Sequence, residues 1–277
     1  MTDAKHDPVA ELVELGLERR EARWLVEEFL PGGDPDAMPV LLAAAQRRVA
    51  GEPLQYIIGH WPFRSLELDL DDRVLIPRPE TEELVDVALG ELAAAGASAP
   101  LIFDLGCGSG AIGLSMLEEL LARGVAATLI ALDESPDALD LARSNARKHR
   151  LHAVSFVESS WFSTLDASLR GHVDVIVANP PYVGDAEMAG LDAVLGYEPR
   201  GALVARDAQG VVGFEDVGVI VRDALAWLCP GGSLVMEHGE GQRSALVGLA
   251  HQYGYVDVRD LDDLSGRPRM FVGRRPA

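Results

Sequence analysis

Apolar residues in the first fifty positions recur at helical spacing, with breaks at Pro and Gly. The apolar face of the clearest predicted helix consists of Ala22, Leu25, Val26 and Phe29. Residues 31–33 read Pro-Gly-Gly and end this helix. A further helix is predicted between Pro39, which suits a first helical turn, and Gly51, which suits a stop. Because this helical region is small for an independent core, we interpret residues 1–53 as a helical domain that packs on another part of the chain or docks a substrate.

The pattern changes between residues 54 and 76. Residues 56–58 are a short apolar run, and residues 66–70 alternate apolar and polar side chains with a period of two. Both segments are predicted to be strands, and residues 54–76 are interpreted as a β-hairpin linker. A Pro-containing stretch, Ile76 to Pro79, then leads into a predicted helix over residues 80–89.

From residue 101 onward, apolar strands alternate with helical segments. Helices are predicted after the glycine-rich turn at 106–110 and over residues 136–149. The predicted strands cover residues 101–105, 128–132, 155–158, 173–178, 234–237, 255–258 and 270–272. Buried apolar strands that alternate with helices are typical of an α/β fold with a doubly wound parallel sheet. We therefore expect residues 77–277 to form one Rossmann-like domain.

A glycine-rich turn follows the predicted strand 101–105. Its candidate cofactor-binding residues are Asp104, Gly106, Cys107, Gly108, Ser109 and Gly110. Glycines at such a turn let the backbone bend sharply and approach a ligand, and the next helix points its N-terminus there. Gly106, Gly108 and Ala111 also satisfy a loose dinucleotide fingerprint, so the motif alone leaves the cofactor open. The form Asp-x-Gly-x-Gly-x-Gly favours S-adenosyl-L-methionine, with Asp104 facing its ammonium group.

Two residues after later strands are further candidates for the same site. Asp133 ends the predicted strand 128–132, where an acidic side chain can accept hydrogen bonds from both ribose hydroxyls. Trp161 follows the strand 155–158 and offers a flat indole that can pack on adenine. An ordinary core aromatic is the competing interpretation of Trp161, and a small packing residue is the competing interpretation of Cys107.

Asn179, Pro180, Pro181 and Tyr182 follow the predicted strand 173–178, at the edge where open α/β sheets bind ligands. The prolines fix φ and remove backbone donors, so the loop presents its carbonyl oxygens rigidly. Asn179 Oδ1 and the Pro180 carbonyl can each accept one N–H of a target NH2 group, and Tyr182 offers a flat face. These contacts would orient a weakly nucleophilic planar nitrogen toward an activated methyl group. The alternative is a rigid structural turn.

The amino-acid composition restricts the classes of molecule that this protein is expected to bind. The chain of 277 residues carries 24 Lys and Arg against 44 Asp and Glu, a net charge of −20. Such a surface repels phosphate backbones, so we expect no direct nucleic-acid partner. The N-terminal residues do not resemble a signal peptide, and no apolar run is long enough to span a membrane, so we expect a cytoplasmic location. The working expectation is a monomer, although no sequence feature determines the oligomeric state. Cys107 and Cys229 lack the spacing of a metal site or a disulfide framework, and no metal is expected.

Beyond these features, the sequence resembles the HemK/PrmC family of protein-(glutamine-N5) methyltransferases over nearly the whole chain. The matching segments are residues 51–56, 76–82, 104–110, 179–182, 197–199, 230–232, 237–239 and 263–269, with Gly273 and Arg274. Asn-Pro-Pro-Tyr alone is shared with DNA adenine methyltransferases, whereas the segment 76–82 is far more specific. The N-terminal region is only loosely similar to the family.

The resemblance implies a helical N-terminal domain, a hairpin linker and a seven-stranded methyltransferase domain. It also implies methylation of the glutamine in the Gly-Gly-Gln loop of peptide chain release factors, with S-adenosyl-L-homocysteine as product. Residues 106–110, Asp133, Trp161 and Asn179 would contact the cofactor, and residues 179–182 would contact the glutamine. The alternatives are a nucleic-acid amino-methyltransferase, acting on adenine N6 or guanine N2, and a cofactor-binding protein without catalysis.

Overall fold

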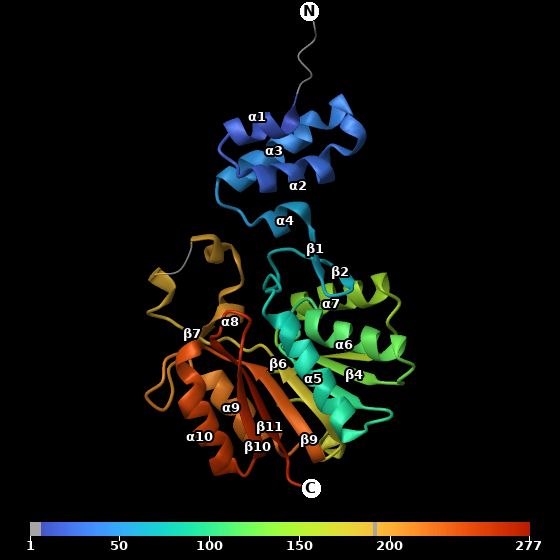
Figure 1. Ribbon diagram of the computed structural model, residues 1–277, viewed down its shortest axis with the longest axis vertical. Coiled ribbons are helices and arrows are strands. Elements are labelled where there is room, and N and C mark those ends of the chain that lie inside the picture. Colours follow the sequence, from blue (N-terminus) through green and yellow to red (C-terminus); the bar gives the residue numbers. More distant parts are fainter. Residues whose placement is uncertain (1–6, 191–192) are drawn as a thin grey trace, which may run out of the picture.

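The computed structural model describes residues 7–190 and 193–277. Figure 1 shows a small group of N-terminal helices joined to a larger α/β unit. The helices are α1 (Pro8–Glu14), α2 (Arg19–Phe29), α3 (Met38–Val49) and α4 (Leu54–Ile58). Short 3-10 turns at Pro31–Gly33 and Pro35–Ala37 connect α2 to α3. Leu12, Leu25 and Leu41 are fully buried at the centre of this group, so the helices predicted from the first fifty residues are confirmed.

The predicted strand at residues 56–58 is wrong, because these residues belong to the helix α4. Gly59 ends this helix in the left-handed conformation, with φ of 86°. Leu54 and Ile57 are three positions apart and share one helix face, which is buried against the N-terminal helical core. A short apolar run fits a buried helical turn as well as a strand, and here the contacts with the neighbouring helices favour the helix.

The β-hairpin that follows consists of β1 (His60–Phe63) and β2 (Leu66–Asp69), paired antiparallel. It lies against α7 (Pro136–Lys148) of the larger unit. Asn145 Oδ1 accepts a 2.7 Å hydrogen bond from the Asp69 amide, and Lys148 Nζ forms a 2.6 Å ion pair with the Asp69 carboxylate. Phe63, Leu66 and Leu68 of the hairpin are buried in the apolar core of the α/β unit, so the hairpin connects the helical group to that unit through both polar and apolar contacts.

Seven strands form the main sheet in the order β10-β11-β9-β6-β3-β4-β5. Their bounds are β3 (Leu101–Leu105), β4 (Thr128–Asp133), β5 (Val154–Glu158), β6 (Val173–Ala178), β9 (Leu228–Glu237), β10 (Val256–Asp262) and β11 (Pro268–Arg274). β11 runs antiparallel to both β9 and β10, so the expectation of a wholly parallel sheet is corrected. The short connection between β10 and β11 cannot make the long crossover that parallel strands need.

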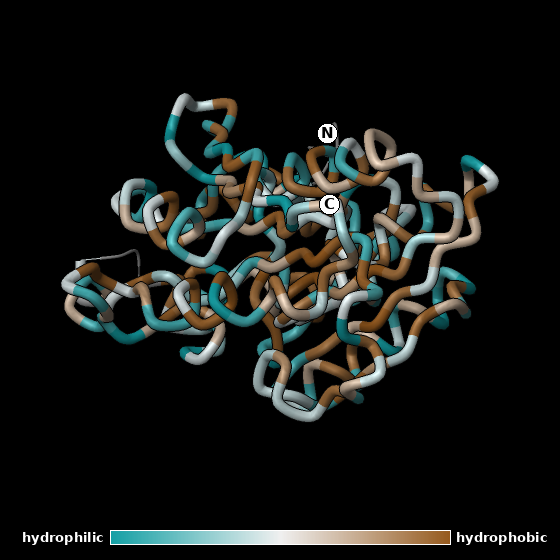
Figure 2. The backbone as a smooth tube through the Cα atoms, turned by 90° about the horizontal axis from the view of Figure 1, so that it is seen from below, coloured by the Kyte–Doolittle hydropathy of each residue, from teal (hydrophilic) through white to brown (hydrophobic). Residues whose placement is uncertain are grey.

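Helices cover both faces of this sheet, as the predicted doubly wound fold requires. One face carries α5 (Thr81–Ala95), α6 (Ala111–Ala122) and α7, and the other carries α9 (Glu215–Ala224) and α10 (Arg243–Tyr253). Successive strand residues point to opposite faces: Ile102 lies in the first apolar core, and Phe103 lies in the second. Figure 2 shows the hydrophobic segments gathered in the middle of the molecule and hydrophilic ones at its outer loops.

The connection between β6 and α9 adds small elements over one end of the sheet. β7 (Val183–Gly184) pairs parallel with β8 (Val204–Ala205), and α8 (Arg200–Leu203) precedes β8. Short 3-10 turns lie at Met188–Gly190 and Ala193–Tyr197. Tyr197 Oη donates a 3.2 Å hydrogen bond to the Ala50 carbonyl, so this connection contacts the N-terminal helical group.

Strand β3 marks the point where the sheet order reverses, since β4 lies on one side of it and β6 on the other. In open α/β sheets a crevice forms beyond the carboxyl ends of the strands at such a point. The predicted turn 106–110 follows β3, Asp133 ends β4, and Asn179 follows β6. The fold therefore brings the predicted segments to one edge of the sheet. Within the described residues, no helix has the length and apolar character of a membrane span.

Candidate active site

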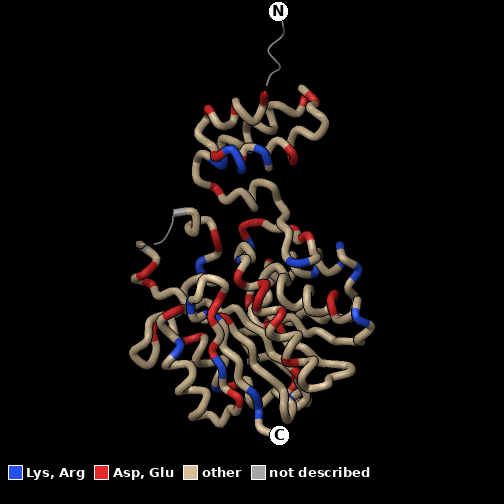
Figure 3. Tube along the Cα trace, viewed as in Figure 1, with Lys and Arg blue, Asp and Glu red and all other residues tan. Residues whose placement is uncertain are grey.

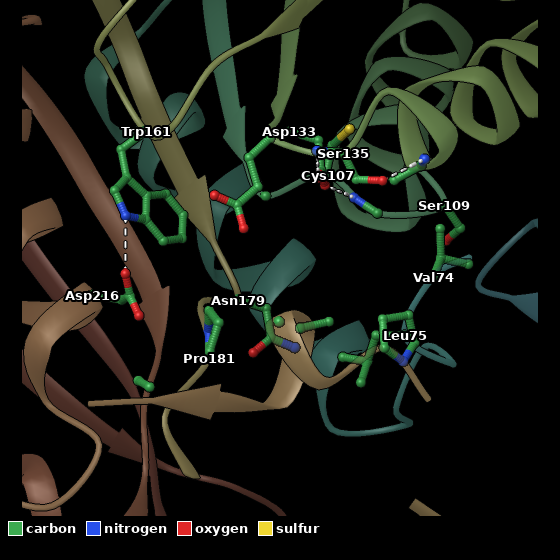
Figure 4. Close-up of a pocket in the computed structure, with 18 of the residues that line it drawn as sticks. Val74, Leu75, Cys107, Ser109, Asp133, Ser135, Trp161, Asn179, Pro181 and Asp216 are labelled. Carbon is green, nitrogen blue, oxygen red and sulfur yellow. Dashed lines mark hydrogen bonds between the residues drawn. The ribbon is translucent and has the colours of Figure 1, made fainter. Parts of the chain in front are cut away.

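A cavity of about 440 Å³ lies at this edge. Figure 4 shows side chains from several separate elements around it. The sequence-predicted residues that line it are Gly106, Cys107, Gly108, Ser109, Asp133, Trp161, Asn179 and Pro181. Asp104, Gly110, Pro180 and Tyr182 do not line this cavity. The larger part of the predicted set thus meets in one place, although the elements that carry it are far apart in sequence.

The turn after β3 owes its shape to glycines with positive φ. Gly106, Gly108 and Gly110 have φ values of 68°, 53° and 84°, which side chains with a Cβ adopt reluctantly. The Cys107 amide donates a 2.8 Å hydrogen bond to the Leu132 carbonyl, which fixes the turn to β4. A Cβ added at Gly108 would meet no atom within 4 Å, so the cavity approaches the bare backbone there. Burial raises the pKa of the Cys107 thiol, as expected for a packing residue.

Gly110 has a packing role in this turn. A Cβ at this position would lie 2.6 Å from Leu114 Cδ1, and Leu114 is fully buried. The neighbouring Ser109 is also buried, and its carbonyl accepts a 2.9 Å hydrogen bond from Asn145 Nδ2. Gly110 therefore lets α6 begin close to the turn, and Asn145 joins the turn to α7 and the hairpin.

The Asp133 carboxylate connects the glycine-rich turn to the start of α7. Its Oδ2 accepts a 2.9 Å hydrogen bond from the Gly108 amide, and its Oδ1 accepts one of 3.0 Å from the Ser135 amide. Burial raises the pKa of the carboxyl group, while these backbone hydrogen bonds oppose the rise. Each carboxylate oxygen keeps a further lone pair, and the residue lines the cavity. Asp133 can therefore accept hydroxyl groups of a ligand while it holds the turn.

Asp104 lies beneath the turn instead of on the cavity wall. The residue is fully buried, and its Oδ2 accepts a 2.9 Å hydrogen bond from the Gly113 amide. Its Oδ1 has no hydrogen-bond partner in the part of the chain that the structure describes. Burial raises the pKa of this carboxyl group to about 7. An acidic group with a free oxygen thus lies behind the glycine-rich turn.

Trp161 faces the turn from the opposite side of the cavity. A Cβ at Gly106 would lie 3.5 Å from the indole ring, so the ring packs over the glycine backbone. The indole Nε1 donates a 3.1 Å hydrogen bond to Asp216 Oδ1, which Figure 4 shows as a dashed line. Asp216 lines the same cavity. Sequence reasoning missed Asp216, because no motif marks it and it lies on α9, far from Trp161 along the chain.

Asn179 connects this cavity to a second, smaller one of about 40 Å³. Pro180 and Tyr182 line the small cavity together with Asn179, whereas Pro181 lines the large one. Burial raises the pKa of the Tyr182 phenol, and the Arg269 guanidinium lies 5.6 Å from the centre of its ring. The loop therefore divides its side chains between two adjoining spaces, with Asn179 at the junction.

Residues from the 76–82 segment complete the junction. Thr81 lines the large cavity and Arg78 lines the small one. Asn179 Nδ2 donates a 3.4 Å hydrogen bond to Thr81 Oγ1. Arg78 Nη2 donates a 2.6 Å hydrogen bond to Glu198 Oε1, a buried acceptor that also receives the Ile76 amide at 3.0 Å through Oε2. The sequence marked residues 76–82 and 197–199 only as matching segments, and the ion pair joins these two segments beside the small cavity that the Asn179 loop lines.

Comparisons with known proteins place this arrangement in a family. Residues 87–193 match the family model of the methyltransferase small domain. The release factor glutamine methyltransferase of Aliivibrio fischeri is 38% identical over 232 residues, which are 84% of this chain and 77% of that protein. The protein of the same name from Burkholderia pseudomallei is 41% identical over 248 residues, 88% of this chain and 83% of its own length.

Solved structures agree on the fold. The hMettl16 catalytic domain, solved in complex with the MAT2A 3′UTR hairpin 1, superposes with a TM-score of 0.55 over 98% of this chain and 92% of that chain, at 15% identity. Identity at this level supports the methyltransferase fold alone. The relatives from Aliivibrio and Burkholderia are similar over most of both chains and thus decide the family. This chain belongs to the family of release factor glutamine methyltransferases.

Proposed function

We propose that this protein transfers a methyl group from S-adenosyl-L-methionine to the side-chain amide nitrogen of the glutamine in the Gly-Gly-Gln segment of peptide chain release factors. The observation that carries the proposal is the position of Asn179, which borders both a cavity of about 440 Å³ and one of about 40 Å³. The large cavity has room for a nucleotide-like cofactor, and the small one suits a slender planar group. Asn179 lies where a methyl donor and its acceptor would meet.

The residues of the large cavity fit the cofactor chemically. The indole face of Trp161 suits adenine, and the lone pairs that Asp133 keeps suit the ribose hydroxyls. The bare backbone at Gly108 leaves space for a ligand. Asp104 lies beneath the turn, behind the cavity wall, with a free Oδ1, and its ionised form would attract an ammonium group through its charge alone. When bound, S-adenosyl-L-methionine supplies a methyl group on a positively charged sulfur.

The small cavity fits a primary amide. Asn179 Oδ1 and the Pro180 carbonyl can each accept one N–H of the target, while the Tyr182 ring borders the same space. An amide nitrogen is a weak nucleophile because its lone pair is delocalised. Fixed hydrogen-bond acceptors therefore raise the rate of methyl transfer mainly by positioning the nitrogen and by stabilising the charge that develops on it. The nitrogen would form its new bond to the methyl group as the methyl–sulfur bond of the donor breaks and S-adenosyl-L-homocysteine leaves, and it would then release one proton to water. A general base is therefore not obligatory.

The remainder of the chain suits a protein substrate. We propose that the N-terminal helical group, expected at residues 1–53 and extended by α4 to residue 58, forms a substrate-docking domain, that the hairpin and the segment up to residue 76 link it, and that residues 77–277 form the methyltransferase domain. The Tyr197 hydrogen bond to the Ala50 carbonyl supports a fixed relation between the helical group and the loop above the site. Figure 3 shows acidic positions spread through the α/β unit. With a net charge of −20, this surface favours a basic protein segment over a nucleic acid.

The proposal is tested by incubating the purified protein with methyl-labelled S-adenosyl-L-methionine and a release factor. We expect label in the release factor and none in a variant whose Gly-Gly-Gln glutamine is replaced by alanine. A matched reaction with DNA or RNA as acceptor should remain unlabelled. Label in nucleic acid with none in release factor would favour the amino-methyltransferase alternative and overturn the proposal.

A further inference from the structure

The orientation of the Asn179 amide decides what this residue can offer a substrate. An Asn side chain has an acceptor oxygen at one end and a donor NH2 at the other. Only the oxygen can bind an N–H of a target amide, since two NH2 groups facing each other would leave a polar group without its partner. A productive site must therefore hold Asn179 Nδ2 away from the target.

Thr81 provides a partner for that nitrogen. It begins α5, is buried, and lines the large cavity. Its Oγ1 accepts the 3.4 Å hydrogen bond from Asn179 Nδ2, a long contact of the kind that tightens when a substrate complex forms. However, a threonine hydroxyl can either donate or accept. Taken alone, Thr81 could thus stabilise either orientation of the Asn179 amide.

Glu237 removes this ambiguity. It is the last residue of β9, the strand beside β6. The sheet register pairs Met236 of β9 with Ala178 of β6, so the residues that follow them, Glu237 and Asn179, leave the sheet side by side. Its side chain is buried, its Oε1 has no hydrogen-bond partner among the described residues, and the Thr81 hydroxyl lowers the pKa of its carboxyl group as a donor would. An ionised carboxylate only accepts hydrogen bonds, so the Thr81 hydroxyl must donate to Glu237. The Thr81 oxygen is then left to accept from Asn179.

We propose that Thr81, with its hydroxyl proton held by the Glu237 carboxylate, is the positioning residue that turns Asn179 Oδ1 toward the substrate amide. This inference rests on the proposed function and adds to it. Thr81 and Glu237 need no contact with the target, and they act through Asn179 alone. The order of donors is Asn179 Nδ2 to Thr81 Oγ1, and then the Thr81 hydroxyl to Glu237.

The charge of Glu237 makes the arrangement sensitive to pH. Burial raises the pKa of this carboxyl group to about 7, and the hydrogen bond from Thr81 and the charge of Arg269 oppose the rise. The other groups that act on it are Glu80 before α5, His238 on the same segment and Tyr182. Above pH 7 the carboxylate accepts from Thr81. Below pH 7 the protonated group can donate to Thr81, which then can donate to Asn179 Oδ1 and reverse the amide.

Three variants test the proposal in release factor methylation at saturating S-adenosyl-L-methionine. Thr81→Val keeps the shape of the side chain but removes the hydroxyl. We expect kcat at pH 8 to fall about 10- to 100-fold, the loss typical of residues that orient a group in direct contact with the reacting centre. Thr81→Ser should recover most of that loss. The activity of Glu237→Gln should fall less below pH 7 than the activity of the wild type, because the glutamine side chain does not titrate. Cofactor binding measured by titration calorimetry should stay within about threefold for Glu237→Gln, because Glu237 does not line the large cavity.

The variants also separate this inference from the proposed function. An inactive wild-type protein with a folded, cofactor-binding site would contradict the proposed function itself. An active wild-type protein whose Thr81→Val variant keeps its kcat would overturn the role of Thr81 alone. A pH profile of Glu237→Gln identical to the wild-type profile would overturn the role of Glu237, and would assign the acid limb to another group such as Asp104. Should Thr81→Val fail to fold, the nearly isosteric Glu237→Gln and Thr81→Ser still decide the proposal.

Discussion

The indole Nε1 of Trp161 donates a 3.1 Å hydrogen bond to Asp216 Oδ1 at the wall of the large cavity. The two residues come from elements far apart in the sequence, one after β5 and one on α9. Trp161 has a positive φ of 49°, a conformation that non-glycine residues adopt only where their surroundings hold them. Asp216 thus fixes the plane of the aromatic ring that faces the Gly106 backbone.

We expect Asp216→Ala to weaken S-adenosyl-L-methionine binding by about 2- to 12-fold, the equivalent of one lost hydrogen bond of ~0.5–1.5 kcal/mol. Asp216→Asn, which keeps an acceptor oxygen, should lose less. Asp223→Ala is the control, because Asp223 lies on the same helix, does not line the cavity, and pairs with the exposed Arg222. Equal affinities for Asp216→Ala and the control in calorimetric titration would show that the ring needs no such partner.

Asp133→Ala should lower cofactor affinity by roughly 10- to 150-fold, corresponding to ~1.5–3 kcal/mol for hydrogen bonds to a charged group. Part of the loss arises because the Gly108 and Ser135 amides lose their acceptor. Asp140→Ala is a matched control, since Asp140 lies on α7 and its side chain pairs with Arg143 at the surface. A titration with unchanged affinity for Asp133→Ala would remove this residue from the site.

Gly110→Ala should destabilise the fold more than Gly124→Ala. Both glycines have positive φ, 84° and 76°, so each substitution incurs a similar backbone cost of about 1–2 kcal/mol. At Gly110 the new Cβ would also lie 2.6 Å from the buried Leu114, whereas at Gly124 it would meet nothing within 4 Å. We expect a further ~1–3 kcal/mol from this crowding, measured by urea unfolding. Equal free energies of unfolding would mean that α6 shifts to make room.

Asn179→Ala should slow methyl transfer by about 10²–10³, the magnitude typical of one lost preorganised polar group. The effect belongs in kcat, because Asn179 Oδ1 orients the nitrogen that reacts. Single-turnover measurements with saturating cofactor and release factor separate this step from binding. Turnover close to that of the wild type would refute the position of Asn179 at the reacting nitrogen.

The sequence predicted those parts of the site that depend on local pattern. The apolar run 101–105 and the glycines after it specify a buried strand and a tight turn, and the structure places them as expected. Asn179 was identified because it directly follows the apolar strand β6. In a parallel sheet, residues that follow neighbouring strands gather at one edge, so the meeting of Gly108, Asp133 and Asn179 followed from the fold class.

Contacts between distant segments could not be predicted in this way. Residues 56–58 are apolar in a manner that fits either a strand or a buried helical turn, and only the N-terminal helices favour α4. Asp216 and Glu237 each acquire a role from a partner on another element, Trp161 in one case and Thr81 in the other. The elements β7, β8 and α8 are too short for their periodicity to be recognised.

The most direct test of the central claim is mass spectrometry of a release factor after incubation with this protein and S-adenosyl-L-methionine. The account predicts one added methyl group on the side-chain amide of the Gly-Gly-Gln glutamine, present with the wild-type protein and strongly reduced with Asn179→Ala. An unmodified glutamine after reaction with a folded, cofactor-binding protein, or a methyl group on a different residue, would contradict it.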